Sequence, residues 1–145
     1  RKEIVEWLRQ RSRPYLFSNA LAPMIAATCI KAIDKVQHED SLRAQLQENT
    51  LFFRAGLEEL GFTLLPGEHP IIPVMIGDEN QAVQMANALY QRGIYVVGFS
   101  YPVVPRGQAR IRTQMSAALT RAHLERALEA FAEVGRELQI LGRAA

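Results

Sequence analysis

The stretch Gly107-Gln108-Ala109-Arg110-Ile111-Arg112-Thr113-Gln114-Met115-Ser116 (residues 107–116) is predicted to be a strand that carries two arginines two residues apart. Because strand side chains alternate between two faces, Arg110 and Arg112 lie on the same face. The planar guanidinium group is a fork of hydrogen-bond donors that suits a carboxylate. One interpretation is therefore a site for a small carboxylate, such as an amino acid. The other is that both arginines lie on a solvated face or pair with the protein's own acids.

The segments around this strand predict a small sheet covered by helices, an α/β fold of the α+β sandwich kind. Apolar periodicity, helix caps and glycine or proline stops predict helices at about residues 2–11, 19–36, 42–60, 78–91 and 120–138. Further strands are predicted at about residues 62–65, 71–76 and 94–97. Pro73 would need an edge or bulge position in the second of these strands, because proline cannot donate to a sheet.

The composition is that of a globular protein without an obvious polyanionic partner. The 145 residues suffice for one domain with a real core, and 48% of them are hydrophobic. The net charge of +2, from 17 basic and 15 acidic residues, gives no support for a nucleic-acid partner. No apolar run approaches the length of about 18 residues that a membrane span needs, so no membrane partner is expected.

The single cysteine and the start of the chain bear on location. Cys29 cannot form an internal disulfide, and its apolar neighbours in the helix at 19–36 predict a buried, inert thiol. This fits a reducing cytosol, so the expected location is cytoplasmic. The chain has neither an initiator methionine nor the apolar stretch of a signal peptide at its start. We expect it to begin partway through a larger protein.

Few other segments carry chemistry. The histidines are far apart and no ligand spacing supports a metal site. His123, in the first turn of a predicted helix, is expected to have a surface or capping role. Ser18 and Asn19 lie at the start of the helix predicted to run to about residue 36, where one of them caps the helix or they bind a phosphate. The loop at 99–107 is either functional or a proline-stiffened connection to the arginine strand.

Four blocks of the chain resemble one enzyme family, the α-oxoamine synthases, which are pyridoxal-phosphate enzymes of fold type I. The blocks cover residues 7–19, 71–78, 92–99 and 101–118. Within the last block, Tyr101-Pro102-Val103-Val104-Pro105-Arg106-Gly107-Gln108 is the specific part, and it is most similar to the glycine C-acetyltransferases of the family. Sister enzymes share a shorter arginine-strand motif without this proline loop. The likeness covers nearly the whole chain and resembles the C-terminal part of such enzymes only.

The resemblance implies a role for two residues. Arg112 matches the arginine that binds the amino-acid carboxylate. Ser18 matches the residue that reaches the phosphate of the neighbouring subunit's pyridoxal 5'-phosphate, which implies a homodimer with an active site across its interface. Residues 1–37 would be the end of the large domain and the interdomain helix, and residues 38–145 the C-terminal small domain with a mainly antiparallel sheet. The implied reaction joins glycine and acetyl-CoA to give 2-amino-3-oxobutyrate and CoA, or runs in reverse in threonine breakdown.

The chain departs from the family in one large respect. The family's Schiff-base lysine lies in a Gly-Lys-rich loop upstream of the matched region. Lys2 falls in the helix after that loop, so no catalytic residue is expected in this chain. We therefore expect the chain alone to be inactive. Three alternatives stay open: a sister acyltransferase such as 8-amino-7-oxononanoate synthase, a non-catalytic interaction domain derived from the same fold, or an unrelated α/β domain with structural arginines.

Overall fold

The computed structural model describes residues 1–13 and 21–142, which fall into two compact units, Arg1–Asp40 and Ser41–Ala145. The first unit contains the helices α1 (Lys2–Arg11) and α3 (Pro23–His38). Pro23 occupies the first turn of α3, where its fixed φ angle suits a helix and its missing N–H would have no partner. None of the helices in the described part of the chain is long and apolar enough to cross a membrane.

The burial predicted for the helix around Cys29 is wrong for this chain. No side chain of α3 is buried, and the Cys29 thiol is exposed. Ile25, Ile30 and Ile33 are exposed as well, the last two by 70% and 59%. The apolar side of α3 packs on no core among the described residues. Its apolar side chains, which a helix of this composition normally buries, are therefore exposed in this chain.

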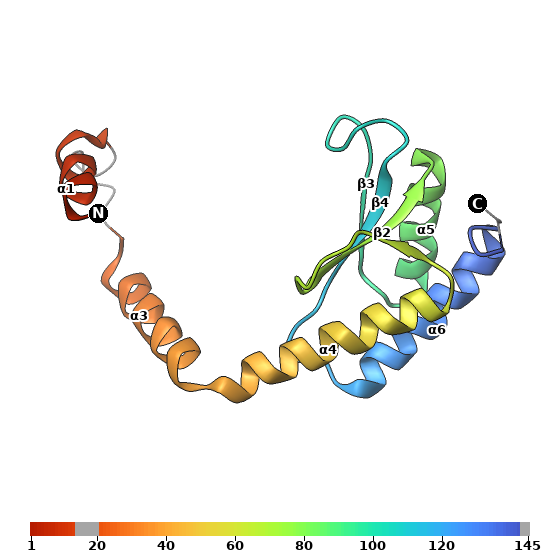
Figure 1. The fold of residues 1–145 in the computed structure, drawn as a ribbon, viewed down its shortest axis with the longest axis horizontal. Coiled ribbons are helices and arrows are strands. Elements are labelled where there is room, and N and C mark those ends of the chain that lie inside the picture. The colour runs from red at the N-terminus through yellow and green to blue at the C-terminus, as the bar shows by residue number, and fades with distance from the viewer. Residues whose placement is uncertain (14–20, 143–145) are drawn as a thin grey trace. The chain divides into compact units, whose positions relative to one another are not determined.

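The second unit is an α+β sandwich, which confirms the predicted fold class (Figure 1). Four strands form one antiparallel sheet in the order β1-β2-β4-β3, and three helices pack on it. The strands are β1 (Thr63–Leu64), β2 (Ile71–Gly77), β3 (Val97–Phe99) and β4 (Ala109–Gln114). The helices are α4 (Asp40–Glu59), α5 (Glu79–Gln91) and α6 (Arg121–Glu137).

One face of the sheet and the three helices share a single core. Ile72, Val74 and Ile111 point into it from β2 and β4, and each is fully buried. The helices contribute mainly large apolar side chains: Phe53, Leu57, Met85, Leu89, Leu124, Phe131 and Val134. Because side chains alternate along a strand, the neighbours of these strand residues lie on the opposite face, and they do not belong to the core. The arginines of β4 lie on this opposite face, which we call the open sheet face.

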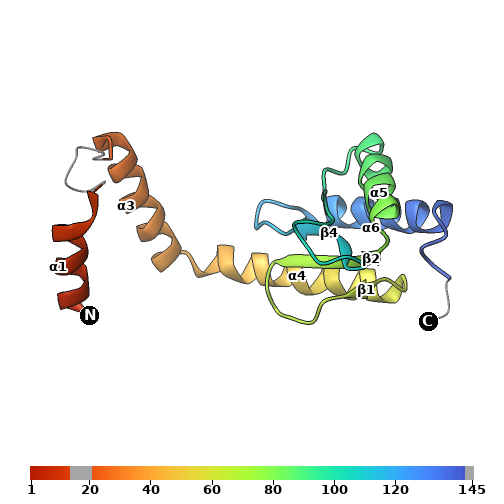
Figure 2. The ribbon, with the colours of Figure 1, turned by 90° about the horizontal axis from the view of Figure 1, so that it is seen from above.

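Helices α4 and α6 lie side by side, as Figures 1 and 2 both show. Phe131 of α6 makes edge-to-face contacts with Phe53 of α4 and with Phe62, at ring-centroid distances of 6.0 and 5.8 Å. Gly135 of α6 permits this close packing, because a Cβ atom there would lie 2.7 Å from Leu141 Cγ and 2.8 Å from Phe62 Cζ. The aromatic contacts and the small residue together fix α6 against the core.

Two details of the predicted strands need correction. The third strand is Val97–Phe99 rather than 94–97, because Ile94 and Val96 pack against the core and only Val97 and its successors align with β4. Pro73 lies in β2, which is a central strand rather than an edge. It is tolerated because β1 ends at Leu64, so the missing N–H of Pro73 faces the residue just beyond β1.

Candidate functional site

Arg112 lies on the open sheet face between apolar neighbours. The register pairs it with Val97 of β3 on one side and with Pro73 of β2 on the other. Its guanidinium carbon lies over the ring of Phe99, 4.6 Å from the ring centroid. Apolar cross-strand partners support the aliphatic stem and leave the charged end at the surface, where it is exposed.

Arg112 and Arg110 share this face, as predicted, but differ in their polar contacts. The Arg110 guanidinium donates from Nε to the Gln108 carbonyl at 3.2 Å and from Nη2 to Gln108 Oε1 at 3.4 Å. Within residues 1–13 and 21–142, no carboxylate or carbonyl accepts a hydrogen bond from Arg112. The donors of Arg112 are therefore open to a ligand, whereas those of Arg110 are partly engaged by the protein.

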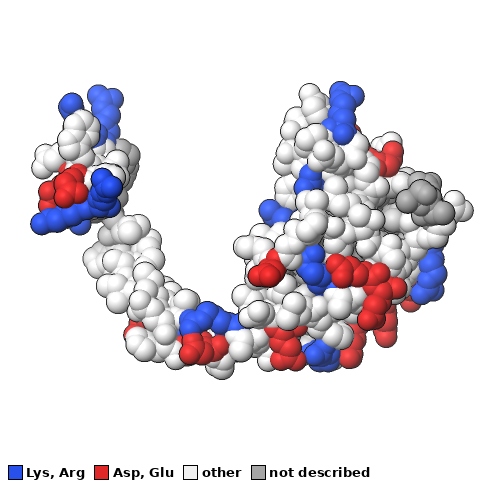
Figure 3. Space-filling view, viewed as in Figure 1, with Lys and Arg blue, Asp and Glu red and all other residues white. Residues whose placement is uncertain are grey.

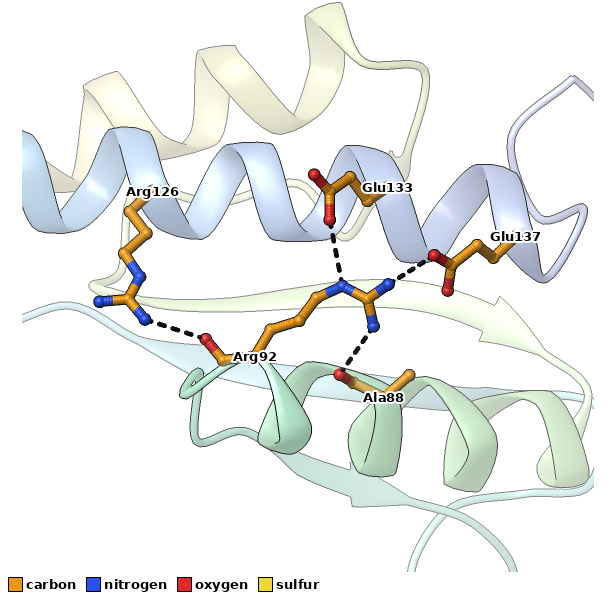
Figure 4. A network of polar contacts seen from close by, with 5 residues as sticks. All are labelled: Ala88, Arg92, Arg126, Glu133 and Glu137. Carbon is orange, nitrogen blue, oxygen red and sulfur yellow. Dashed lines mark hydrogen bonds and ion pairs between the residues drawn. The ribbon is translucent and has the colours of Figure 1, made fainter.

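Arg92 shows what a structural arginine looks like in this fold (Figure 4). It follows the C-terminus of α5 and forms ion pairs with Glu133 and Glu137 of α6, with a distance of 3.1 Å to Glu133. Its Nη1 also donates to the Ala88 carbonyl at 3.2 Å, while Arg126 donates to the carbonyl of Arg92 itself. This network joins two helices, and nothing comparable surrounds Arg112 in the part of the chain that the structure describes.

On the second unit, the acidic side chains visible in Figure 3 gather mainly over α4 and α6. Glu133 and Glu137 of α6 are the partners of Arg92. The acids that could neutralise an arginine thus lie chiefly on the helical side of the second unit. An incoming carboxylate would meet the positive charge of Arg112 without a competing acid bound to it.

The loop between β3 and β4 is held by its own contacts. The Ser100 carbonyl accepts hydrogen bonds from the N–H groups of Val103 and Val104, at 2.9 and 3.2 Å. The guanidinium of Arg106 lies 4.6 Å from the centroid of the Tyr101 ring. These turns return the chain from β3 to β4, so that Phe99 and Arg112, distant in sequence, become neighbours on one face.

Other sequence-based hypotheses have simpler outcomes. His123 closes a capping box with Thr120 at the start of α6, which confirms its predicted capping role. The described residues contain no group of His, Cys, Asp and Glu side chains that could hold a metal ion. Ser18, predicted to reach a cofactor phosphate, lies outside the described residues. Phe99 was not singled out from the sequence, although it stands at the start of the loop that was.

One cavity of about 390 Å³ lies on the helical side of the sheet. Phe53, Phe131 and Met115 line its apolar part, and Gln114, Arg126 and His123 lie at it too. Arg112 is not among its lining residues. The arginine therefore contributes to an open surface of this chain rather than to that cavity.

Comparison with known proteins gives these features a family context. The model of the family "Aminotransferase class I and II" matches residues 1–131. The chain is 55% identical to the 2-amino-3-ketobutyrate coenzyme A ligase of Escherichia coli K12, over 97% of this chain and 35% of that protein. It is 44% identical to the 8-amino-7-oxononanoate synthase of Symbiobacterium thermophilum, over 97% of this chain and 36% of that protein. The chain thus spans about a third of the length of these relatives.

A solved structure agrees with the sequence matches. A lysine-to-alanine variant of serine palmitoyltransferase from S. paucimobilis, with a bound PLP–myriocin aldimine, superposes with a TM-score of 0.88 at 31% identity, covering 94% of this chain and 35% of that one. The matched region is the C-terminal part of such enzymes. The resemblance to the α-oxoamine synthases, enzymes that depend on pyridoxal phosphate, is thereby confirmed, and an unrelated α/β domain is excluded. The chain belongs to the class I and II aminotransferase family.

Proposed function

We propose that this chain supplies the carboxylate-binding arginine and the small domain of an acyltransferase that joins glycine and acetyl-CoA, giving 2-amino-3-oxobutyrate and CoA. The observation that carries the proposal is the state of Arg112. Its guanidinium is exposed on the open sheet face and lacks an acceptor among the described residues, while Arg110 and Arg92 are engaged by the protein. The similarity to the Escherichia coli ligase supports the choice of substrates.

In this proposal Arg112 binds and orients the amino acid. Its two terminal N–H groups would donate to the two carboxylate oxygens of glycine, a planar pairing that a lysine cannot make. Fixing the carboxylate fixes which Cα–H bond is directed out of the plane of the reacting group. Orientation of this kind contributes several orders of magnitude to a rate.

Pyridoxal phosphate would supply the electron sink for the carbanion formed at the glycine α carbon. We propose that the described residues do not hold this cofactor by themselves. Each of the three lysines pairs with a carboxylate three or four residues further along the chain: Lys2 with Glu6, Lys31 with Asp34 and Lys35 with Glu39. The lysine that the resemblance implies would belong to a segment outside this chain. We therefore propose that the chain alone is inactive and that the parent protein binds the cofactor.

The remaining expectations are proposals of the same kind. Ser18 would donate to the cofactor phosphate of a neighbouring subunit, in a homodimer of cytoplasmic location. Residues 1–37 would belong to the large domain and the interdomain helix, and residues 38–145 to the small domain. The division of the structure between Asp40 and Ser41 and the exposed apolar side chains of α3 support that assignment.

A second candidate is a sister enzyme such as 8-amino-7-oxononanoate synthase, which the 44% identity to the Symbiobacterium protein favours. It would use the same Arg112 with another amino acid or acyl-CoA. The loop at 99–107, which resembles the glycine C-acetyltransferases, supports the first candidate instead. A non-catalytic interaction domain would keep the fold without binding an amino acid at all.

The test is an assay of the longest reading frame that contains this chain. CoA release would be measured with glycine and acetyl-CoA, with and without added pyridoxal phosphate, and then with other amino acids and acyl-CoA thioesters. Cofactor-dependent release that is fastest with glycine and acetyl-CoA supports the first candidate. Release that is faster with another pair supports the sister enzyme, and no release with any pair contradicts both.

A further inference from the structure

We infer that Phe99 is a positioning residue that holds the guanidinium of Arg112 ready for the substrate carboxylate. This inference rests on the proposed function, because it concerns the residue proposed to bind glycine. Phe99 itself does not need to touch the substrate. Its ring face and the Arg112 guanidinium carbon, 4.6 Å from the ring centroid, are within the range of a cation–π contact.

The sheet register explains why this contact forms. Phe99 of β3 lies opposite Arg110, and Val97 lies opposite Arg112, so Phe99 and Arg112 are diagonal neighbours on the open sheet face. Diagonal neighbours in an antiparallel pair are within reach of each other when one side chain is aromatic and the other long. The shorter Val97 side chain supports the stem of Arg112 and leaves the ring of Phe99 to support its charged end.

The contact matters because Arg112 has no other restraint at its charged end in the described chain. Arg110 is held by two hydrogen bonds to Gln108, and Arg92 by three acceptors. An arginine on an exposed strand otherwise samples many rotamers, and ordering them on binding weakens affinity. A ring face restrains the guanidinium plane without occupying its N–H donors. Phe99 thus orders Arg112 and leaves all its donors for a carboxylate.

The chain contains a matched control for this effect. Arg106 lies over Tyr101 at the same centroid distance of 4.6 Å, in the loop that joins the two strands. Tyr101 is exposed and lies in the loop, away from the β3–β4 pairing that brings Phe99 to Arg112. Tyr101→Leu therefore removes an arginine–aromatic contact from the same loop without touching Arg112.

The first measurement needs no catalytic activity. Protons on Arg112 Cδ and Nε are followed by NMR in the wild-type chain, in Phe99→Leu and in Phe99→Tyr. The inference predicts upfield ring-current shifts for these protons in the wild type and in Phe99→Tyr, and their loss, with faster side-chain motion, in Phe99→Leu. Tyr101→Leu should leave them unchanged. Unshifted Arg112 protons in the folded wild-type chain would overturn the inference.

The second measurement is kinetic, in the reading frame used for the activity assay. Phe99→Leu should raise KM for glycine about two- to fivefold, as expected for an exposed cation–π contact. KM for acetyl-CoA should stay the same, and Phe99→Tyr should restore the glycine KM. A Phe99→Leu enzyme with the wild-type glycine KM would overturn the inference. Arg112→Ala, measured in parallel, separates the two ideas: if it too leaves the glycine KM unchanged, the proposed function fails as well.

Discussion

The contact between Arg54 and Leu65 compensates for a proline in a central strand, which can be tested by a double-mutant cycle. Leu65 N–H donates to the Pro73 carbonyl at 3.2 Å. In an antiparallel ladder the opposite bond would run from the N–H of residue 73 to the Leu65 carbonyl, but proline has no N–H. The Arg54 guanidinium, from α4, donates to that carbonyl from Nη1 at 2.9 Å instead.

The magnitude follows from the surroundings of the bond. A hydrogen bond from a charged donor contributes about 1.5–3 kcal/mol. Leu65 is 36% exposed, so water can partly replace the donor, and the buried Arg54 Nε lacks an acceptor in the described chain. We therefore expect Arg54→Met to lower the free energy of unfolding by about 1 kcal/mol, below the range for a charged donor and within the range of about 0.5–1.5 kcal/mol for an ordinary hydrogen bond.

The second mutation supplies the missing donor. In Pro73→Val, the new N–H can donate to the Leu65 carbonyl, so Arg54→Met should cost about half as much or less in that background. The assay is urea unfolding of the four variants by far-UV circular dichroism, with linear extrapolation to water. Arg126→Met, which removes a donor to the Arg92 carbonyl, is the control and should cost the same in both backgrounds. Equal costs of Arg54→Met with and without Pro73 would refute the compensation.

Further predictions concern packing, capping and the cofactor. Gly135→Ala should lower the free energy of unfolding by about 1–3 kcal/mol in urea unfolding, because the new Cβ would overlap Leu141 and Phe62. This loss outweighs the higher helix propensity of alanine, about 1 kcal/mol. A more stable variant would contradict the tight packing of Gly135 against Leu141 and Phe62. Thr120→Ala should lower the free energy of unfolding by about 1 kcal/mol, because it removes the side-chain cap of α6. Thr120→Ser should retain most of the wild-type stability, and an unchanged unfolding midpoint in Thr120→Ala would contradict this role. Ser18→Ala in the parent protein should retain less pyridoxal phosphate after dialysis, measured by cofactor absorbance, and equal occupancy would count against its role.

The sequence predicts the helices and the arginine strand well because their signals are local. Apolar periodicity and caps place α4, α5 and α6 within two residues of their observed bounds. The period of two along β4 is enough to place Arg110 and Arg112 on one face. Which face that is, and whether an acid lies on it, depends on the packing of segments distant in sequence.

The errors arise from such non-local effects. In the apolar run at 94–97, Ile94 and Val96 pack against the core and do not pair with β4. The strand therefore begins only at Val97. Pro73 is accepted in a central strand because α4, about twenty residues earlier, supplies the donor that it lacks. Phe99 becomes a neighbour of Arg112 through the β3–β4 register, which the sequence does not specify across a long loop. Cys29 is exposed because no core among the described residues packs against α3.

We propose that Arg112, and not its neighbour Arg110, binds the amino-acid carboxylate. The direct measurement compares KM for glycine in Arg112→Ala and Arg110→Ala, made in the longest reading frame that contains this chain. Loss of charge-assisted hydrogen bonds should raise KM in Arg112→Ala about 10- to 100-fold, while Arg110→Ala should stay within about twofold of the wild type. A glycine KM that is unchanged in Arg112→Ala, or raised equally in both variants, would contradict the account.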